Sequence, residues 1–294
     1  MQSKANQPKR HHFVPQMMLQ HFTDSDKNLW FWRREFEYGD VRKSKPKNLF
    51  VEKDLYTYIN FDGTKDIALE RFFSDLEGTG AEFIRQLADI VRSGAVPELD
   101  DSAWEFWRHF FFYQLKRSPA FINATSERIG FRETVRATVE RIKATESAAS
   151  IADSHEDLED RFYKYATLMA QSQAPTDEII SAFQALGLAI FRITDPSKSF
   201  IIGDITGATA HIGKSDKTIS NVVLFVPLTF DIALGHFKKP RTVDVYNVNR
   251  EQIRQMNIAT AERSSIIAGR SQNLIDSISR RATYRGVTDP EEEK

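Results

Sequence analysis

The sequence predicts an α+β protein in which a mainly helical middle is flanked by small antiparallel β units from the N- and C-terminal parts. The strongest amphipathic stripe in the chain covers residues 66–91, where apolar side chains recur at spacings of three and four. Short β-branched runs separated by Gly, Pro and Asn occupy residues 200–248, and short apolar runs with turn residues occupy residues 29–59. Because helices and strands occur in blocks, an alternating βαβ fold is disfavoured.

The chain is expected to form a single interlocked domain over residues 1–294. Its parts are an N-terminal β unit with a His-His motif (1–65), a helical region (66–194), a C-terminal β unit with a closing helix (195–270) and a polar tail (282–294). The two β units lie at opposite ends of the chain, and neither has enough strands to bury its own faces. We therefore expect one domain rather than two independent ones.

Composition limits the chemistry that the protein can perform. The chain contains no cysteine, so any metal ion must be held by His, Asp or Glu side chains. No apolar stretch reaches the roughly 18 residues of a membrane span, and the N-terminus lacks the apolar run of a signal peptide. We therefore expect a cytoplasmic protein that does not bind a membrane.

The charge of the chain is balanced overall but uneven along its length. The net charge is −1, whereas residues 1–53 contain 11 Lys and Arg against 6 Asp and Glu, together with three His. A basic N-terminal region favours an anionic partner, although a solvated basic arm would have the same composition.

The N-terminal unit is expected to begin with a short helix or turn and to continue as short strands. The apolar residues Met17, Met18, Leu19 and Phe22 follow Pro15, a residue that suits the first turn of a helix. The apolar runs at residues 29–32 and 49–59 are short, and the sequence FDGT at residues 61–64 is typical of a turn.

Two carboxylates lie on the margin of the helix predicted over residues 66–91. Glu70 and Glu77 are two turns apart, so their side chains lie almost above one another on this helix. They could share a site at the edge of a buried face, or they could be ordinary charges at its rim.

The next helix carries a heavily aromatic face. Residues 102–105 have the form of a capping box, and Pro119 ends the helix. Gln114 projects into the aromatic face, and Arg117 lies three residues further on. A buried Gln needs hydrogen-bond partners, so Gln114 must meet either another polar group of the core or a ligand.

The remaining elements are three helices, four short strands and a closing helix. The helices are expected over residues 123–147, 156–172 and 176–193, and the closing helix over residues 250–267. Between them, β-branched runs predict strands at residues 200–202, 222–226, 231–234 and 243–248.

The adjacent His11 and His12, which precede Pro15, are the most distinctive local feature of the chain. Imidazole titrates near neutral pH, which suits a general base or a metal ligand. Neighbouring residues of an extended strand point to opposite faces, so one of the two enters a given site, and we favour His12. A structural role beside aromatic side chains is the alternative.

Four ordered motifs resemble a family known as domain of unknown function 4238, whose members are mainly bacterial. Residues 11–22 resemble its HHxVPxxxLxxF opening, and Glu70 and Glu77 resemble its paired-glutamate helix. Residues 114–119 (QLKRSP) resemble its Q-x-x-R-[ST]-P block. Residues 200–204 (FIIGD) resemble its F-I-x-[SG]-D strand. The resemblance spans nearly the whole chain, and it implies positions for a site rather than a reaction.

Three details qualify this resemblance. Residues 226–229 (VPLT) and Asn257 fall where the family has a PLT-like run and a late Asn. The Asp of the family's strand is usually followed by a short residue and Pro-Val, whereas residues 205–208 (ITGA) follow Asp204 here. This departure puts the local turn and the role of Asp204 in doubt.

The HHxxP opening is also similar to that of HNH and endonuclease-VII type nucleases. In those enzymes a His activates water, an Asn orients it, and a second His on the following helix helps to hold a divalent metal ion. Asn48 could serve as the Asn, but no His lies between His21 and His109. The helix that should supply the second His offers Glu70 and Glu77 instead.

The first functional hypothesis is a metal-dependent phosphoester hydrolase or nuclease, with bacterial defence as a suggested setting. Its catalytic residues would be His11, His12, Glu70 and Glu77. A divalent Mg²⁺ or Mn²⁺ ion would be held by His12, Glu70, Glu77 and Asp204, because imidazole and carboxylates ligate such ions. Nucleic acid or a phosphorylated small molecule would be bound by Gln16, Gln114, Arg117 and Ser118, with the Arg fork holding a phosphate oxygen.

Two other hypotheses remain open. The chain could be a binding module or sensor that recognises a nucleotide or another anionic ligand through the same polar residues without cleaving it. Alternatively, the polar residues could form a buried network that fixes the fold.

Overall fold

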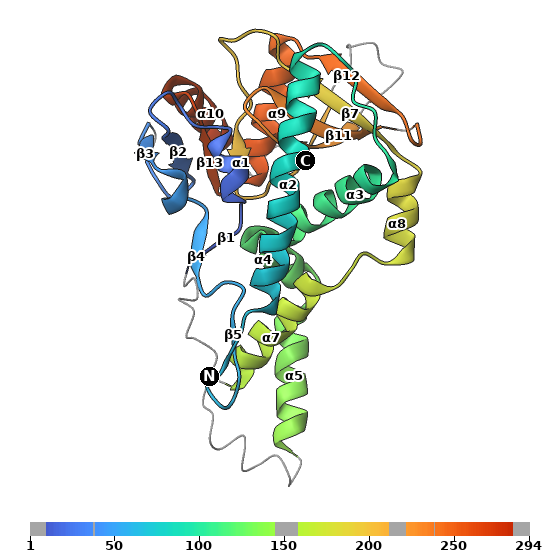
Figure 1. Cartoon of the computed structure of the whole chain (residues 1–294). Coiled ribbons are helices and arrows are strands. Elements are labelled where there is room, and N and C mark those ends of the chain that lie inside the picture. The colour runs from blue at the N-terminus through green and yellow to red at the C-terminus, as the bar shows by residue number, and fades with distance from the viewer. Residues whose placement is uncertain (1–9, 38, 145–157, 212–221, 238, 285–294) are drawn as a thin grey trace, which may run out of the picture.

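The computed structural model describes residues 10–37, 39–144, 158–211, 222–237 and 239–284. The long helix α2 (Ala68–Arg92) runs through the middle of the molecule, beginning near the helices α5 (Phe131–Lys143) and α7 (Leu158–Ser172) at one end and ending at the sheets at the other (Figure 1). Its first residues therefore lie far from the larger sheets, close to the N-terminal His-His strand.

A four-stranded antiparallel sheet joins the two ends of the chain. Its strands follow the order β3-β2-β13-β8. β2 (Leu29–Arg33) and β3 (Arg42–Ser44) come from the N-terminal part, whereas β8 (Ile202–Gly203) and β13 (Ile266–Gly269) come from the C-terminal part. β2 pairs directly with β13, with Trp32 opposite Ile267. Neither β unit therefore completes this sheet by itself.

A five-stranded sheet is built wholly from the C-terminal half. Its strand order is β12-β7-β11-β10-β9, and β12 and β7 form a parallel pair while the others pair antiparallel. The strands are β7 (Gly187–Arg192), β9 (Ala208–His211), β10 (Val222–Pro227), β11 (Ile232–Phe237) and β12 (Val243–Asn247).

Two short strand pairs complete the β structure near the N-terminus. β1 (Arg10–His12) pairs with β4 (Val51–Lys53), and the 3-10 turn η1 (Pro46–Asn48) precedes β4. β5 (Tyr58–Ile59) and β6 (Lys65–Asp66) form the hairpin predicted around the FDGT turn. The short helix α1 (Gln16–Gln20) follows Pro15, as its sequence predicts.

The other helices surround α2 and cover the sheets. α3 (Asp101–Lys116) and α4 (Pro119–Arg128) are separated by Arg117 and Ser118, and the smaller helix α8 (Asp177–Gln184) precedes β7. α9 (Arg250–Arg263) and α10 (Gln272–Tyr284) close the described part of the chain. Blocks of helices and small, mainly antiparallel sheets confirm the predicted α+β class.

One continuous apolar cluster joins α1, α2 and α3 to the five-stranded sheet. Its fully buried side chains include Phe73, Ile84, Phe110 and Phe225. A second cluster, around Trp32, Ile267 and Ile275, fills the space between the four-stranded sheet and α10. None of the described helices combines the length and the apolar character that crossing a lipid bilayer requires.

Several predicted boundaries are wrong. The helix predicted over residues 176–193 ends at Gln184, because residues 187–192 are buried as β7 between β11 and β12. A fully buried apolar run has no period that distinguishes strand from helix. The N-cap of α3 is Asp100, whose side chain accepts a hydrogen bond from the Ala103 amide, and not Ser102.

The C-terminal part differs most from the prediction. The closing helix ends at Arg263, and residues that were expected to continue it form β13 instead. The strand β9 and the helix α10 were not predicted. Residues 282–284 of the predicted polar tail belong to α10, and residues 285–294 lie outside the described residues.

Candidate functional site

The pairing of β1 with β4 holds His11 in the interior. The His11 side chain is buried, and the Tyr56 amide N–H donates a hydrogen bond to its Nδ1 over 2.9 Å. The two rings are stacked, with 5.7 Å between their centroids. Because Nδ1 accepts a hydrogen bond, we assign the proton of the neutral ring to Nε2. Glu70 Oε2 lies 3.6 Å from the same Nδ1 atom of His11.

His12 points to the opposite face of β1, as strand geometry requires. Its Nε2 lies 3.3 Å from the Pro46 carbonyl oxygen, and burial lowers the pKa of its imidazole. The backbone oxygen of His12, by contrast, accepts a hydrogen bond from Arg117 Nη2 over 2.7 Å. Of the two rings, that of His11 contacts Glu70, whereas the His12 ring contacts the Pro46 carbonyl oxygen; the preference for His12 as the residue that acts in the site stays a prediction.

The two glutamates both face the interior margin of α2. Burial raises the pKa of Glu70, and the positive charge of Arg117 acts against this effect. Glu77 Oε1 accepts a hydrogen bond from Arg117 Nη2 over 2.6 Å. Between them along the helix lies the fully buried ring of Phe73. The side chains of Glu70 and Glu77 keep 23% and 25% of their exposed surface, so solvent reaches both carboxylates.

Arg117 is the centre of the site. Its side chain is only 1% exposed, and its guanidinium lies 4.6 Å from the centroid of the Phe73 ring. Burial acts against the charge of Arg117, but Tyr56 and Glu77 outweigh this effect and raise its pKa. Arg117 therefore stays charged inside the protein.

Tyr56 links the histidine to the arginine. Its hydroxyl donates a hydrogen bond to the Arg117 carbonyl oxygen over 3.0 Å, and burial raises its pKa to about 12. The phenol therefore stays protonated at neutral pH. We call the connected set His11, Tyr56, Glu70, Glu77 and Arg117 the Arg117 cluster.

Several polar atoms next to this cluster are buried without a hydrogen bond. Within the described part of the chain, Nε and Nη1 of Arg117 have no hydrogen-bond partner, and neither do the two amide atoms of Gln114. Gln114 is fully buried one turn before Arg117, on the same side of α3. Buried polar groups are nearly always hydrogen-bonded, so this pair calls for an explanation.

Asp204 and Asn257 hold the backbone of the family-like strand. Asp204 Oδ1 accepts hydrogen bonds from the amides of Ile205 and Ser265. Asn257 donates to the Ser199 carbonyl oxygen and accepts from the Ile201 amide. These contacts give both residues a bracing role in the structure.

Two other predicted ligand-binding residues have local roles. Ser118 is the N-cap of α4, and its Oγ accepts a hydrogen bond from the Phe121 amide. Gln16 is the first residue of α1 and lines a groove at the surface. Pro46, whose carbonyl oxygen contacts the His12 ring, lines the same groove. The other lining residues are Gln20, Thr23, Lys27, Lys45 and Lys47. Gln16 therefore shares a groove with the partner of His12.

The predicted metal ligands are only partly brought together. Glu70 and Glu77 lie beside Arg117, whereas the His12 ring contacts the Pro46 carbonyl oxygen and the Asp204 carboxylate is engaged by backbone amides. Among the residues that the structure describes, no group of three His, Asp or Glu side chains is arranged to hold a metal ion. Binding of Mg²⁺ or Mn²⁺ stays a prediction.

Tyr56 is the site residue that sequence reasoning missed. It lies in an apolar run that predicts a strand, and nothing in that run distinguishes it from Tyr58. Only its amide contact with His11 and its hydroxyl contact with Arg117 show its place in the site.

The fold and the site define an α+β protein in which a buried arginine links the N-terminal His-His strand to the glutamates of α2. The family described as "Protein of unknown function (DUF4238)" matches residues 10–273. The chain belongs to this family. Comparison with curated proteins and with solved structures gives no match.

Proposed function

We propose that this protein binds a phosphate-bearing ligand at the Arg117 cluster. The observation that carries the proposal is the buried pair Arg117 and Gln114, whose Nε, Nη1 and amide atoms have no hydrogen-bond partner within the described residues. A phosphate oxygen matches the planar fork of an arginine, and it also accepts a hydrogen bond from a carboxamide.

Glu77 occupies the position that such an anion would take. Its carboxylate accepts a hydrogen bond from Arg117 Nη2, and it is one-quarter exposed to solvent. An incoming phosphate could displace the Glu77 carboxylate toward solvent and bind Arg117 in its place. Glu70, whose pKa is raised by burial, could take up a proton as the negative charge of the ligand approaches.

Substitution of Gln114 separates ligand binding from a purely structural role. We expect Gln114→Leu to leave the stability of the free protein unchanged or to raise it by about 1 kcal/mol, because a buried amide without a partner is removed. We also expect the affinity for a phosphate ligand to fall about tenfold, the loss of one hydrogen bond to a charged group. Thermal unfolding and calorimetric titration with inorganic phosphate and AMP measure the two effects.

Gln171 provides a matched control, because it is an equally buried glutamine whose Nε2 donates to the Lys116 carbonyl oxygen over 3.1 Å. Gln171→Leu should lower stability by about 1 kcal/mol and leave the affinity unchanged. The proposal fails if the wild-type protein binds neither probe. It also fails if Gln114→Leu destabilises the protein as Gln171→Leu does while the affinity stays constant.

Hydrolysis of the bound phosphoester is a second candidate function, and a nuclease would be one form of it. The observation in its favour is the contact of 3.6 Å between His11 Nδ1 and the partly exposed Glu70 carboxylate. A His and a carboxyl group with a raised pKa suit general acid and base roles. In this proposal His12, Glu70 and Glu77 would turn toward a Mg²⁺ or Mn²⁺ ion, which would polarise the phosphoryl oxygen.

Metal-dependent hydrolysis predicts a stabilising effect of the metal ion. The melting temperature of the wild-type protein should rise with Mn²⁺ or Mg²⁺ relative to EDTA, and Glu70→Gln should abolish the rise. Glu70→Gln should also lower the hydrolysis of a phosphodiester or of single-stranded DNA by about 10²-fold or more. Glu82→Gln, on an exposed turn of the same helix, is the control. Absence of both a metal effect and a product in the wild-type protein would contradict this candidate.

A further inference from the structure

A second polar pocket lies between α9, α10 and the segment that leads into β8. Its volume is about 510 Å³, within the range of small-molecule sites. Four cationic side chains line it, and none of the lining residues carries a carboxylate; the cations are Lys198, Arg250, Arg254 and Arg281. The pocket is therefore positively charged, and it lies on different elements from the Arg117 cluster.

Within the part of the chain that the structure describes, three of these cations have no counter-charge in direct contact. Arg254 pairs with Glu251 over 3.2 Å. Among the described residues, no hydrogen bond or ion pair engages the side chains of Lys198, Arg250 and Arg281, although the charge of Asp195 acts on Lys198 from a greater distance. Like charges gathered around one hollow repel one another, and a bound anion would remove this repulsion.

The walls of the pocket are fixed by hydrogen bonds. Asn257 lines it and is held by the Ser199 carbonyl oxygen and the Ile201 amide. Ser271 lies before the first turn of α10, and its Oγ accepts a hydrogen bond from the Leu274 amide. The cations on α9 and α10 therefore project from braced elements rather than from loose loops.

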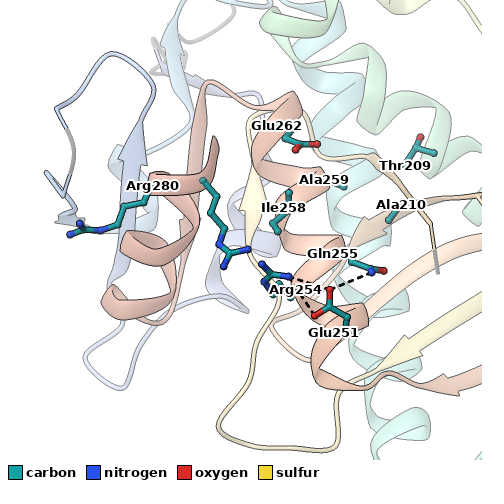
Figure 2. Close-up of a pocket in the computed structure, with 10 residues that line it drawn as sticks. Thr209, Ala210, Glu251, Arg254, Gln255, Ile258, Ala259, Glu262 and Arg280 are labelled. Carbon is teal, nitrogen blue, oxygen red and sulfur yellow. Dashed lines mark hydrogen bonds and ion pairs between the residues drawn. The ribbon is translucent and has the colours of Figure 1, made fainter. Parts of the chain in front are cut away.

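The neighbouring hollow limits the size of the ligand. It shares Arg254 and Arg281 with the pocket, but Glu251 and Glu262 also line it. Figure 2 shows this hollow, where Glu251 reaches back to Arg254 and Gln255 along α9. Carboxylates thus lie on one side of Arg254 only, so this hollow has mixed charge whereas the pocket is lined by positive charge alone. An extended nucleic-acid backbone would meet these carboxylates, whereas a compact polyanion would not.

We infer that the pocket formed by Lys198, Arg250, Arg254 and Arg281 binds the polyphosphate group of a small molecule. A di- or triphosphate carries enough negative charge to engage several of these side chains at once, and arginine forks match its oxygens. This site is independent of the phosphate site proposed at Arg117.

Two neighbouring arginines of α10 provide the test. Arg281 lines the pocket, whereas Arg280 pairs with Asp276 and lines only the neighbouring hollow of mixed charge. Calorimetric titration with inorganic tripolyphosphate at about 0.15 M salt should detect binding to the wild-type protein. Arg281→Gln and Arg250→Gln should each weaken it about tenfold, the loss of one charge-assisted hydrogen bond. Arg280→Gln should change the affinity by less than about twofold.

Parallel titrations identify the ligand and separate the two sites. Equal affinity for ATP and tripolyphosphate means that the phosphates alone are recognised, and tighter binding of ATP means that the base and sugar add contacts. The inference is overturned if the wild-type protein does not bind tripolyphosphate, or if Arg280→Gln weakens binding as much as Arg281→Gln. It is also overturned if Gln114→Leu removes binding while Arg281→Gln does not, or if a short single-stranded DNA binds more tightly than tripolyphosphate.

Discussion

Replacing Glu77 by alanine is expected to lower the free energy of unfolding by about 3 kcal/mol, near the lower end of the range for breaking a buried ion pair. The substitution leaves the Arg117 guanidinium, which is only 1% exposed, without its carboxylate partner. The Arg117 hydrogen bond to the His12 carbonyl oxygen remains, but a carbonyl oxygen does not neutralise a charge. Because Glu77 is partly exposed, water can approach the space that its side chain leaves. We therefore expect a loss near the lower end of the range. Urea-induced unfolding at pH 7 measures the change.

The double variant Glu77→Ala with Arg117→Met tests the cause of this loss. Methionine keeps much of the apolar contact with Phe73 and removes the buried charge. We expect the double variant to be more stable than Glu77→Ala alone, because no uncompensated charge remains. A double variant that is less stable by the sum of the two single effects would contradict the ion-pair explanation.

The second large effect is expected from pH, through His236 on β11. Its ring lies 4.2 Å from the ring of Phe111 and 4.9 Å from that of Phe183, measured between centroids. Both ring nitrogens are shielded from solvent, and a contact with the Gly187 backbone only partly offsets the cost of burying a charged ring. Burial lowers the pKa of His236 from 6.5 to about 4. Its neutral form is therefore strongly favoured in the folded protein.

The direction of the pH effect follows from this lowered pKa. Below pH 6.5 the unfolded chain takes up a proton at His236 that the folded protein does not, so stability falls as the pH falls toward 4. The loss attributable to this residue is about 3 kcal/mol once the pH is below the folded pKa. Above pH 7 the residue should have no effect on the pH dependence of stability.

His236→Phe is the matched variant, because an aromatic ring of similar shape remains between Phe111 and Phe183. The difference in unfolding free energy between wild type and variant should grow in favour of the variant as the pH falls from 7 to 4. Comparing the two proteins cancels the contribution of other titrating groups, such as His21, whose pKa burial also lowers. A difference that stays constant with pH would show that His236 becomes protonated in the folded protein.

The sequence predicts the periodic parts of the fold well. The stripe of apolar residues places α2 almost to the residue, because its period follows from helix geometry whatever the helix packs against. The FDGT turn likewise predicts the β5–β6 hairpin. A fully buried apolar run does not indicate whether it forms a helix or a strand. Residues 187–192 become a strand only because β11 and β12 provide hydrogen-bonding partners.

The candidate site, like the fold, is predicted only in part by the sequence. The sequence by itself determines that His11, Glu70, Glu77, Gln114 and Arg117 are polar residues on or beside buried faces, and the order of their motifs indicates the family. Only the tertiary structure decides that the ring beside Glu70 is that of His11, that Tyr56 joins it to Arg117, and that the Asp204 carboxylate accepts hydrogen bonds from backbone amides. The physical reason is that a helix or strand period fixes which face a side chain occupies. Which partner meets that face depends on contacts between residues far apart in the chain.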